Sequence, residues 1–330
     1  MINNLEEENL SKASLSKYFI FVLMFTIVLI YKIYTIELIS DNLNYYNVYN
    51  NIQNDIMPFQ YEFILSFLMY ISSLIGMDYY QFTFFKVLTF LPIIIYVDRN
   101  ISKRNNIFSY LFLFSFISPP MIGTLIFLAR QSLSLEFFLL LSLIHGFRKK
   151  LPVLIIMFFT HMGSIIWVPI FLWHKRIVAI LNSKLFWVLS CIILIVSVFT
   201  GMDLTKALIQ YLSTLNDLPN FLMANLARKR DFYVIHEETD FDTLSVLNTS
   251  FAVMPALIYI IMVKIKEVEH YTVECLCALY GLSFFLFALF YNNQIFATRV
   301  GFVAYFFGVQ YLFLFLLLAY LNKKNLLNRE

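Results

Sequence analysis

Long uninterrupted apolar runs constrain the fold of this chain more than any other feature. Several of them extend over about 18 or more residues, the length that a helix needs to cross the ~30 Å hydrocarbon core of a bilayer. Hydrophobic residues make up 60% of the chain and charged residues only 14%, against about 25% in soluble domains. The mean hydropathy of +0.75 agrees with this distribution. The sequence therefore predicts an all-α, polytopic helical integral membrane protein.

A single membrane domain, residues 18–322, accounts for almost the whole length. A polar N-terminal tail, 1–17, and a short C-terminal tail, 323–330, flank it, and we expect both to be cytoplasmic. The first apolar run has no small-residue cleavage site after it, so it predicts a membrane helix rather than a removed signal peptide. Two polar stretches, 39–60 and 201–249, are expected to be external segments.

We expect about ten hydrophobic segments, with short or re-entrant helices among them. A full crossing by residues 61–77 would place the basic residues at 99–104 outside, against the positive-inside rule, so this segment is expected only to dip into the membrane. The sequence Ser118-Pro119-Pro120 is expected to end or break a helix, because proline lacks the N–H that a helix interior needs. The last span is expected at 300–321, after a short external loop that ends at Arg299.

Residues 151–173 form an apolar segment with positive charge at both ends. Arg148-Lys149-Lys150 precedes it, where we expect a cytoplasmic loop, and His174-Lys175-Arg176 follows it. Two short helices that turn near His161 would keep both ends inside. Non-helical backbone at that depth is tolerated only if it lines a cavity or is buried in protein. The pattern therefore places His161 at the apex of a helix pair.

On this topology the outer face collects the side chains that could carry chemistry. They are Asp41, Tyr45, Tyr46, Tyr49, Glu62, Arg130, Gln131, His161, Arg228, Arg230 and Arg299. A charge at membrane depth costs about 2.5–3.5 kcal/mol even on the lenient insertion scale, so an arginine there needs a partner or a function. Arginine is well suited to bidentate phosphate contacts. We expect Arg130, His161 and Arg299 to meet in an outward-facing, water-filled cavity that binds a phosphate-bearing, lipid-linked substrate.

Each of these residues also fits a role without chemistry. Arg130 and Arg299 could extend from helix ends to the interface, and His161 could be a satisfied core histidine. The basic run 228–230 could be a solvated loop. Asp41 could cap the helix that follows it. Tyrosines such as Tyr45 and Tyr49, which share one helix face with Asp41, could belong to an aromatic belt.

Several classes of site are absent from the sequence. All three cysteines lie inside apolar runs, where they act as small hydrophobic residues, and there is no Cys/His cluster for zinc. With eight glycines in the chain, neither a Walker-type nor a dinucleotide pattern occurs. The net charge of +3 comes from basic residues that flank spans. We therefore expect no metal, no cofactor and no nucleic-acid partner.

The order of several short motifs resembles a known family. They are Asp41-Asn42-Leu43-Asn44-Tyr45, Glu62-Phe63, Arg130-Gln131 before the basic cluster at 148–150, Thr160-His161 with Pro169 downstream, and Arg299 before the last span. Over roughly residues 40–308 the chain resembles the EpsG/Wzy-type polysaccharide polymerases of bacterial O-antigen and exopolysaccharide assembly. The resemblance implies a GT-C-like membrane bundle in the bacterial cytoplasmic (inner) membrane.

The resemblance also implies a reaction and a substrate. Such enzymes transfer a growing glycan from an undecaprenyl diphosphate carrier to a lipid-linked repeat unit, as metal-independent inverting glycosyltransferases. Arginines that neutralise the leaving diphosphate would stabilise the transition state.

On this basis each candidate residue receives an expected role. Arg130 and Arg299 would bind the diphosphate, with His161 as a third donor or as the general base, and Asp41 or Glu62 as the alternative base. Tyr45 and Tyr49 would stack on sugars. The remaining substrate contacts would come from Gln131, Arg228 and Arg230, and from Glu62 if it is not the base. Chain length is set either by this protein or by a separate regulator.

Three rival classes stay open. A transporter or flippase of lipid-linked sugars would be expected to carry an internal repeat, and none is visible. An O-antigen ligase or sugar O-acyltransferase would carry a histidine in a large external loop, and His236 is the residue that tests it. A structural membrane protein would tolerate the removal of charges at span edges.

Overall fold

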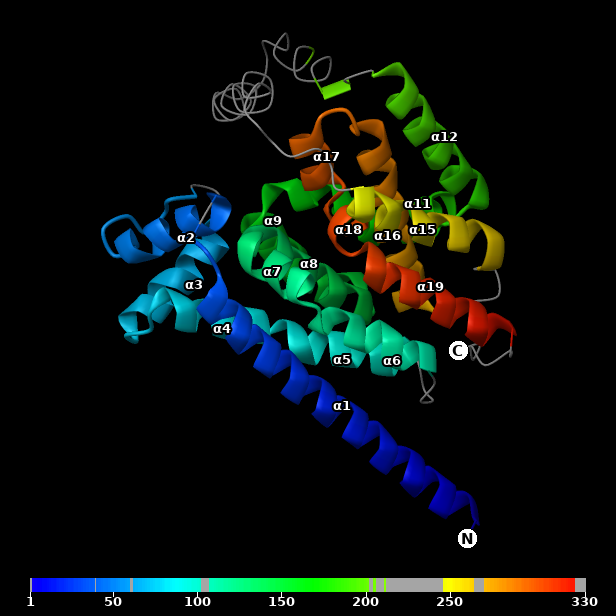
Figure 1. Cartoon of the computed structure of the whole chain (residues 1–330), viewed down its shortest axis with the longest axis horizontal. Coiled ribbons are helices and arrows are strands. Elements are labelled where there is room, and N and C mark those ends of the chain that lie inside the picture. The colour runs from blue at the N-terminus through cyan, green and yellow to red at the C-terminus, as the bar shows by residue number, and fades with distance from the viewer. Residues whose placement is uncertain are drawn as a thin grey trace. The chain divides into compact units, whose positions relative to one another are not determined.

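The computed structural model describes residues 2–38, 40–59, 62–101, 107–201, 204–205, 211, 246–263 and 270–323. Across these residues all regular secondary structure is helical (Figure 1), so the prediction of an all-α protein is confirmed. The chain forms two compact units. The first comprises Met1–Val178, Lys264–Leu276 and Leu316–Glu330, and the second comprises Ala179–Val263 and Cys277–Phe315.

The first unit is built mainly from the N-terminal half of the chain. Its elements are α1 (Ile2–Thr35), α2 (Ser40–Asn51), α3 (Phe63–Leu74), α4 (Tyr79–Leu88), α5 (Phe90–Ile101), α6 (Ile107–Phe114), η1 (Ser115–Ile117), α7 (Pro119–Phe127), α8 (Ala129–Leu143), α9 (Phe147–Thr160), η2 (Met162–Trp167) and α10 (Val168–Leu172). The second unit contains α12 (Lys184–Thr200), α15 (Val246–Met262), α17 (Gln294–Val300) and α18 (Phe302–Phe306). Three helices have residues in both units: α11 (His174–Leu181), α16 (Tyr271–Leu289) and α19 (Gly308–Lys323).

Several described helices are long and apolar enough to cross a membrane. Three qualify outright, Leu15–Thr35, Tyr79–Ile101 and Tyr271–Leu289. Two bent pairs raise the number to five if each pair is one span: Ile107–Ile117 with Pro119–Phe127, bent by 53°, and Met162–Leu172 with His174–Leu181, bent by 105°. Shorter apolar helices of 10–17 residues in the described part of the chain are Phe63–Leu74, Lys184–Thr200, Asn248–Met262 and Gly308–Lys323. The protein is thus polytopic, with fewer full-length spans in the described residues than the ten expected segments.

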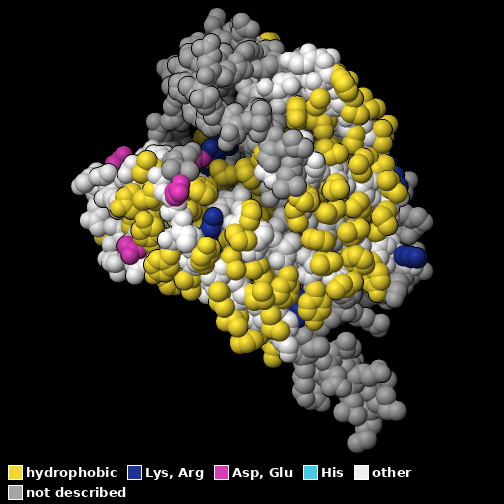
Figure 2. All heavy atoms as spheres, viewed as in Figure 1, with side chains coloured by type: hydrophobic (Ala, Val, Ile, Leu, Met, Phe, Trp, Pro, Cys, Tyr) yellow, Lys and Arg dark blue, Asp and Glu magenta, His cyan; other side chains and the backbone are white. Residues whose placement is uncertain are grey.

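Exposed hydrophobic side chains agree with a lipid environment. They cover much of the face shown in Figure 2. On α12, for example, Leu185, Ile192 and Phe199 are all exposed. A soluble monomer rarely exposes such a continuous apolar surface, whereas contact with lipid tails makes it favourable.

Two predicted helix breaks are present. The helix that contains α6 and η1 ends at Ser118, and α7 begins with the two prolines, whose missing N–H groups are unneeded in a first turn. The segment that carries His161 is also broken as expected, because α9 ends at Thr160 and η2 begins at Met162.

The helix α3 makes up most of the segment 61–77 and is short. Its 12 residues extend over about 18 Å at 1.5 Å per residue, well short of the ~30 Å hydrocarbon core. A helix of this length does not cross the core by itself, and the dip of residues 61–77 into the membrane stays a prediction.

Contacts within the first unit join segments that the sequence places on one side of the membrane. Lys17 forms a buried ion pair with Asp98 at 2.5 Å. Next along α5, the Asn100 amide donates to the Thr272 hydroxyl at 2.9 Å. The adjacent Tyr271 hydroxyl accepts from the ammonium group of Lys150. The expected topology requires Lys17 and the ends of α5, α9 and α16 to lie on the same side.

Two local predictions are wrong. The basic cluster 148–150 lies in the first turn of α9, which begins at Phe147, rather than in a loop. The predicted last span is divided into α17, α18 and α19, so Arg299 lies in the last turn of α17. A closely packed glycine stands at each break: a Cβ on Gly301 would lie 2.5 Å from the Phe287 Cβ, and one on Gly308 would lie 2.2 Å from the Phe251 carbonyl oxygen.

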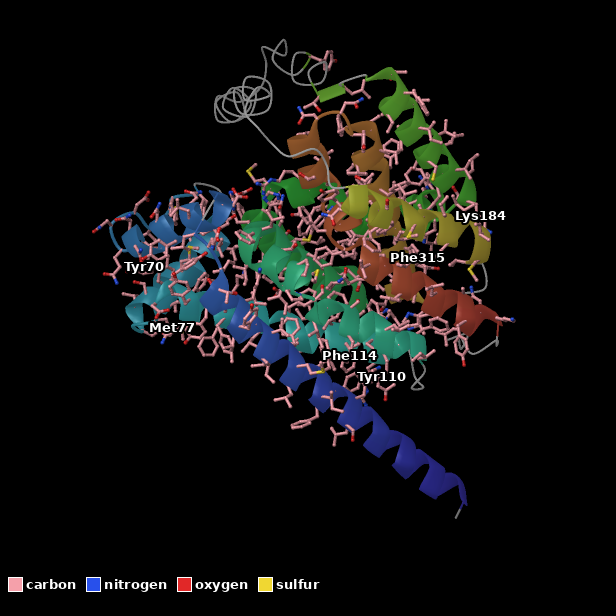
Figure 3. The ribbon with its side chains drawn as sticks, in the orientation of Figure 1. Tyr70, Met77, Tyr110, Phe114, Lys184 and Phe315 are labelled. Carbon is pink, nitrogen blue, oxygen red and sulfur yellow. The ribbon has the colours of Figure 1, made fainter. Side chains whose placement is uncertain are left out.

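Each unit has its own aromatic core. In the first unit, α2, α3, α4 and α8 enclose a cluster of buried residues: Tyr45, Tyr49, Ile52, Leu65, Met69, Tyr79, Phe82, Ala129 and Leu133. In the second unit the Trp187 indole stacks on the Tyr259 ring at 3.9 Å and packs edge-on against Phe315, which Figure 3 labels. The first of these cores supports the candidate site.

Candidate functional site

The Glu62 carboxylate is the centre of a polar cluster in the first unit. Glu62 directly precedes α3, and one of its oxygens, Oε2, accepts a hydrogen bond from Nη1 of Arg130. The other oxygen, Oε1, accepts from the backbone N–H of Met162 at 2.8 Å and lies 3.0 Å from Nδ1 of His161. Three segments far apart in the sequence therefore meet at one carboxylate.

Arg130 is held by more than its ion pair. Its Nε–H donates to the Tyr45 hydroxyl at 3.1 Å, and the centre of its guanidinium lies 4.7 Å from the middle of the Phe59 ring. Such a cation–π contact adds about 0.5–1 kcal/mol at a partly exposed site. The side chain is 31% exposed, against 12% for Glu62. Within the described part of the chain Nη2 makes no hydrogen bond, so this edge of the guanidinium keeps donors for a ligand.

The position of Arg130 depends on a helix break. Leu128 has non-helical dihedrals (φ −102°, ψ 53°) and separates α7 from α8, which places Arg130 in the first turn of α8. The Leu125 carbonyl accepts hydrogen bonds from Nζ of Lys86 at 2.6 Å and from the Ser132 hydroxyl at 3.1 Å. These two donors satisfy a carbonyl at the end of α7, where helical partners run out. They therefore fix the point at which α8 starts.

His161 lies on extended backbone (φ −154°, ψ 111°) between α9 and η2. Its carbonyl accepts from the Ser164 hydroxyl at 2.7 Å and from the Ser164 N–H at 2.9 Å. Because an ionised carboxylate can only accept, the contact with Glu62 places the ring proton on Nδ1. The second ring nitrogen, Nε2, is then the one that can take up a proton.

The surroundings of Glu62 keep it ionised. Burial by itself would raise the pKa of the Glu62 carboxyl, but four effects outweigh it and lower the pKa to about 2. In order of size they are the hydrogen bond with His161, the charge of His161, the charge of Arg130 and the Met162 N–H. A general base at neutral pH needs a much higher pKa. The low pKa, together with the three donors that contact its two oxygens, favours a positioning role for Glu62 over the expected role of alternative base.

Two of the expected site residues are buried. Tyr45 and Tyr49 share a face of α2, as their spacing predicts, but they are only 4% and 5% exposed. The Tyr49 hydroxyl donates to the carbonyl of Met77, which Figure 3 labels, and its ring stacks on Phe82. Their burial disfavours stacking on a sugar and favours a packing role, and Tyr45 also holds Arg130.

The other expected site residues have different environments. Asp41 is half-buried in the first turn of α2, inside the helix rather than at its cap, and Gln131 is buried beside Arg130 in α8. Arg299 is half-buried in the second unit. Arg228, Arg230 and His236 lie outside the described residues.

Sequence reasoning missed several contributors to the site. Phe59 and the Met162 N–H contact the cluster but belong to no motif that the sequence singles out. Gly163 is a third, because a Cβ there would lie 2.7 Å from Nε2 of His161. A glycine two residues after a histidine at a predicted helix break was the available signal.

The fold and the site define a polytopic helical membrane protein with an arginine–carboxylate–histidine cluster. The family model for the EpsG family matches residues 17–328, so the chain belongs to the EpsG family. This membership suggests a membrane-bound polysaccharide polymerase with glycosyltransferase-like chemistry. No curated protein and no solved structure matches the chain.

Proposed function

We propose that this protein transfers a growing glycan from an undecaprenyl diphosphate carrier to a sugar hydroxyl of a lipid-linked repeat unit. We place the reaction at the outer face of the bacterial cytoplasmic membrane. The observation that carries the proposal is the convergence of Arg130 and His161 on the Glu62 carboxylate. An arginine with donors to spare suits a phosphate, and a histidine with a fixed tautomer suits proton transfer.

The transfer needs one bond to form and one to break. The acceptor hydroxyl oxygen attacks the anomeric carbon of the growing glycan, and the bond from that carbon to the phosphate oxygen breaks. The carrier diphosphate leaves with the bonding electrons, and the hydroxyl proton passes to His161. Attack opposite the leaving group inverts the anomeric configuration.

The net charge of the cluster of Glu62, Arg130 and His161 changes as the proton is transferred. With His161 neutral, the charges of Arg130 and Glu62 cancel. Protonation of His161 gives the cluster one net positive charge at the moment when the leaving diphosphate gains negative charge. Stabilisation that grows toward the transition state accelerates the step rather than only tightening binding. Arg299 is proposed as a second arginine for the diphosphate.

The direct test is complementation of a polymerase-deletion strain, followed by a gel that resolves surface glycan length. Arg130→Ala, His161→Ala and Arg299→Ala, each at normal expression, should yield a single-repeat product while the wild-type gene restores a ladder. Full ladders from Arg130→Ala and His161→Ala would overturn the assignment of the site. A ladder that survives in the site variants but is lost with His236→Ala would favour the ligase class.

The absence of a metal requirement is part of the proposal and has its own test. Purified protein in detergent should extend lipid-linked repeat units at an unchanged rate after dialysis against EDTA. A rate that falls and recovers with a divalent cation would replace this part of the mechanism.

A further inference from the structure

We infer that Glu62 and Gly163 are positioning residues for His161: the carboxylate holds Nδ1–H, and the glycine makes room for the imidazole in that orientation. The inference rests on the proposed function, because it assigns roles around the proton acceptor of that site. It also makes a structural claim that can be tested without any activity.

Glu62 makes two contacts with the chain at the start of η2. Nδ1 of His161 and the backbone N–H of Met162 both lie within hydrogen-bond distance of the same oxygen, Oε1. The backbone contact fixes where η2 begins, and the ring contact fixes the rotation of the imidazole about its own axis. Because Nη1 of Arg130 occupies Oε2, the carboxylate cannot rotate without losing one of the three donors.

Gly163 determines whether the imidazole can reach this orientation. An ideal Cβ on Gly163 would lie 2.7 Å from Nε2, 3.2 Å from Cδ2 and 3.3 Å from Cε1 of the His161 ring. These are the three nearest atoms, and all three belong to that one ring. The backbone of Gly163 is not in the left-handed region, so alanine is conformationally allowed there. An alanine should therefore displace the ring and leave the backbone in place.

A purely structural role predicts different behaviour. If the cluster only clamps the break between α9 and η2, the Met162 N–H contact would sustain it, and movement of the ring would cost stability without a specific loss of rate. If Glu62 and Gly163 act through the His161 ring, their substitutions remove the same interaction. Their effects on the rate should then be non-additive, since a pairwise interaction can be lost only once.

The experiment is a double-mutant cycle on the purified full-length protein with Gly163→Ala, Glu62→Gln and both together. We expect Gly163→Ala to lower kcat by about 10–100-fold and Glu62→Gln by about 100-fold, with KM for the repeat unit within about twofold. The double variant should be no slower than Glu62→Gln alone. Multiplied losses in the double variant, or full activity of Gly163→Ala, would overturn the inference.

The chain offers a matched control for each substitution. Gly123→Ala in α7 introduces a Cβ at an ordinary 3.4 Å from the Lys32 side chain, so its activity should be unchanged. Glu274→Gln alters another carboxylate that lies near a histidine, at 3.5 Å from His174, and it should also retain the wild-type rate. A rate loss in either control equal to that of its partner variant would show that the substitution type, not the site, is responsible.

Thermal melting of the same variants separates this inference from the proposed function. The melting temperatures of Gly163→Ala and Glu62→Gln should show the same non-additivity in detergent. If the wild type proves inactive as a polymerase, the proposed function fails while this cycle still tests the positioning. Should Gly163→Ala not fold, the isosteric Glu62→Gln carries the test, and a wild-type rate from it would overturn the inference.

Discussion

Replacing Arg130 with lysine isolates the geometry of the guanidinium from its charge. Arg130 uses Nε for the Tyr45 hydroxyl, Nη1 for Glu62 and the flat face of the group for the Phe59 ring. A lysine has a single nitrogen at the end of a flexible chain. It can pair with Glu62, but it cannot also hold Tyr45 and present a second nitrogen to a ligand.

The cost in stability follows from the contacts that are lost. The hydrogen bond to the buried Tyr45 hydroxyl contributes about 0.5–1.5 kcal/mol, and the contact with Phe59 contributes about 0.5–1 kcal/mol. Arg130 is 31% exposed, so solvent screening places both near the lower end. We expect Arg130→Lys to destabilise the protein by about 1 kcal/mol, which would lower the melting temperature by a few degrees.

The cost in activity should be much larger. Removal of one preorganised donor from a developing anion typically lowers kcat by about 10²–10³-fold, or about 2.7–4 kcal/mol. The prediction is therefore a folded protein whose melting temperature falls by only a few degrees and whose rate is reduced by about a hundredfold. In cells this should appear as single-repeat glycan at normal expression.

The assay compares Arg130→Lys with Arg176→Lys, which makes the same change at an exposed arginine of α11. Both variants are followed by glycan ladder, by initial rate on lipid-linked repeat units and by melting temperature. A full ladder from Arg130→Lys would refute the argument from guanidinium geometry. Equal losses in both variants would attribute the effect to arginine-to-lysine exchange in general.

Three further predictions concern stability. The pKa of Glu62, about 2, lies below its ordinary value, so its ionisation stabilises the fold fully above about pH 4.5 and progressively less as the pH falls toward 2. The melting difference between wild type and Glu62→Gln should therefore shrink as the pH falls from about 4.5 toward 2. Asp98→Asn leaves the 2%-exposed Lys17 without its carboxylate and should cost about 3–5 kcal/mol, measured as a large drop in melting temperature. Gly308→Ala would place a Cβ 2.2 Å from the Phe251 carbonyl oxygen and should abolish folded protein on size-exclusion chromatography.

Local patterns in the sequence predicted much of the secondary structure around the site. The spacing of Asp41, Tyr45 and Tyr49 predicted α2, because side chains four residues apart share a helix face. The positive charges on both sides of residues 151–173 predicted the break at His161, because a single crossing would have placed one charged end outside. Both predictions depend only on residues that lie close together in the sequence.

The partners in the site could not be predicted in this way. Glu62 lies 68 residues before Arg130 and 99 before His161, and no periodicity links positions so far apart. The burial of Tyr45 and Tyr49 was hidden for the same reason: the rings that cover them include Phe82, from α4. A tyrosine that stacks on a sugar and one that packs in a core look alike in sequence.

The contact between Glu62 and Arg130 determines how this arginine can stabilise a leaving diphosphate. A carboxylate beside Arg130 cancels the charge that would attract an anion, so the cluster is poorly designed for binding by net charge. It is well designed for orientation, because the same carboxylate fixes the guanidinium through Oε2 and the imidazole through Oε1. Donors held in place need no reorganisation when charge develops, and this contributes more to a transition state than to a ground state. On the proposed function, loss of Glu62 should therefore reduce kcat far more than it changes the affinity for the lipid-linked substrate, even though the substitution makes the site more positive.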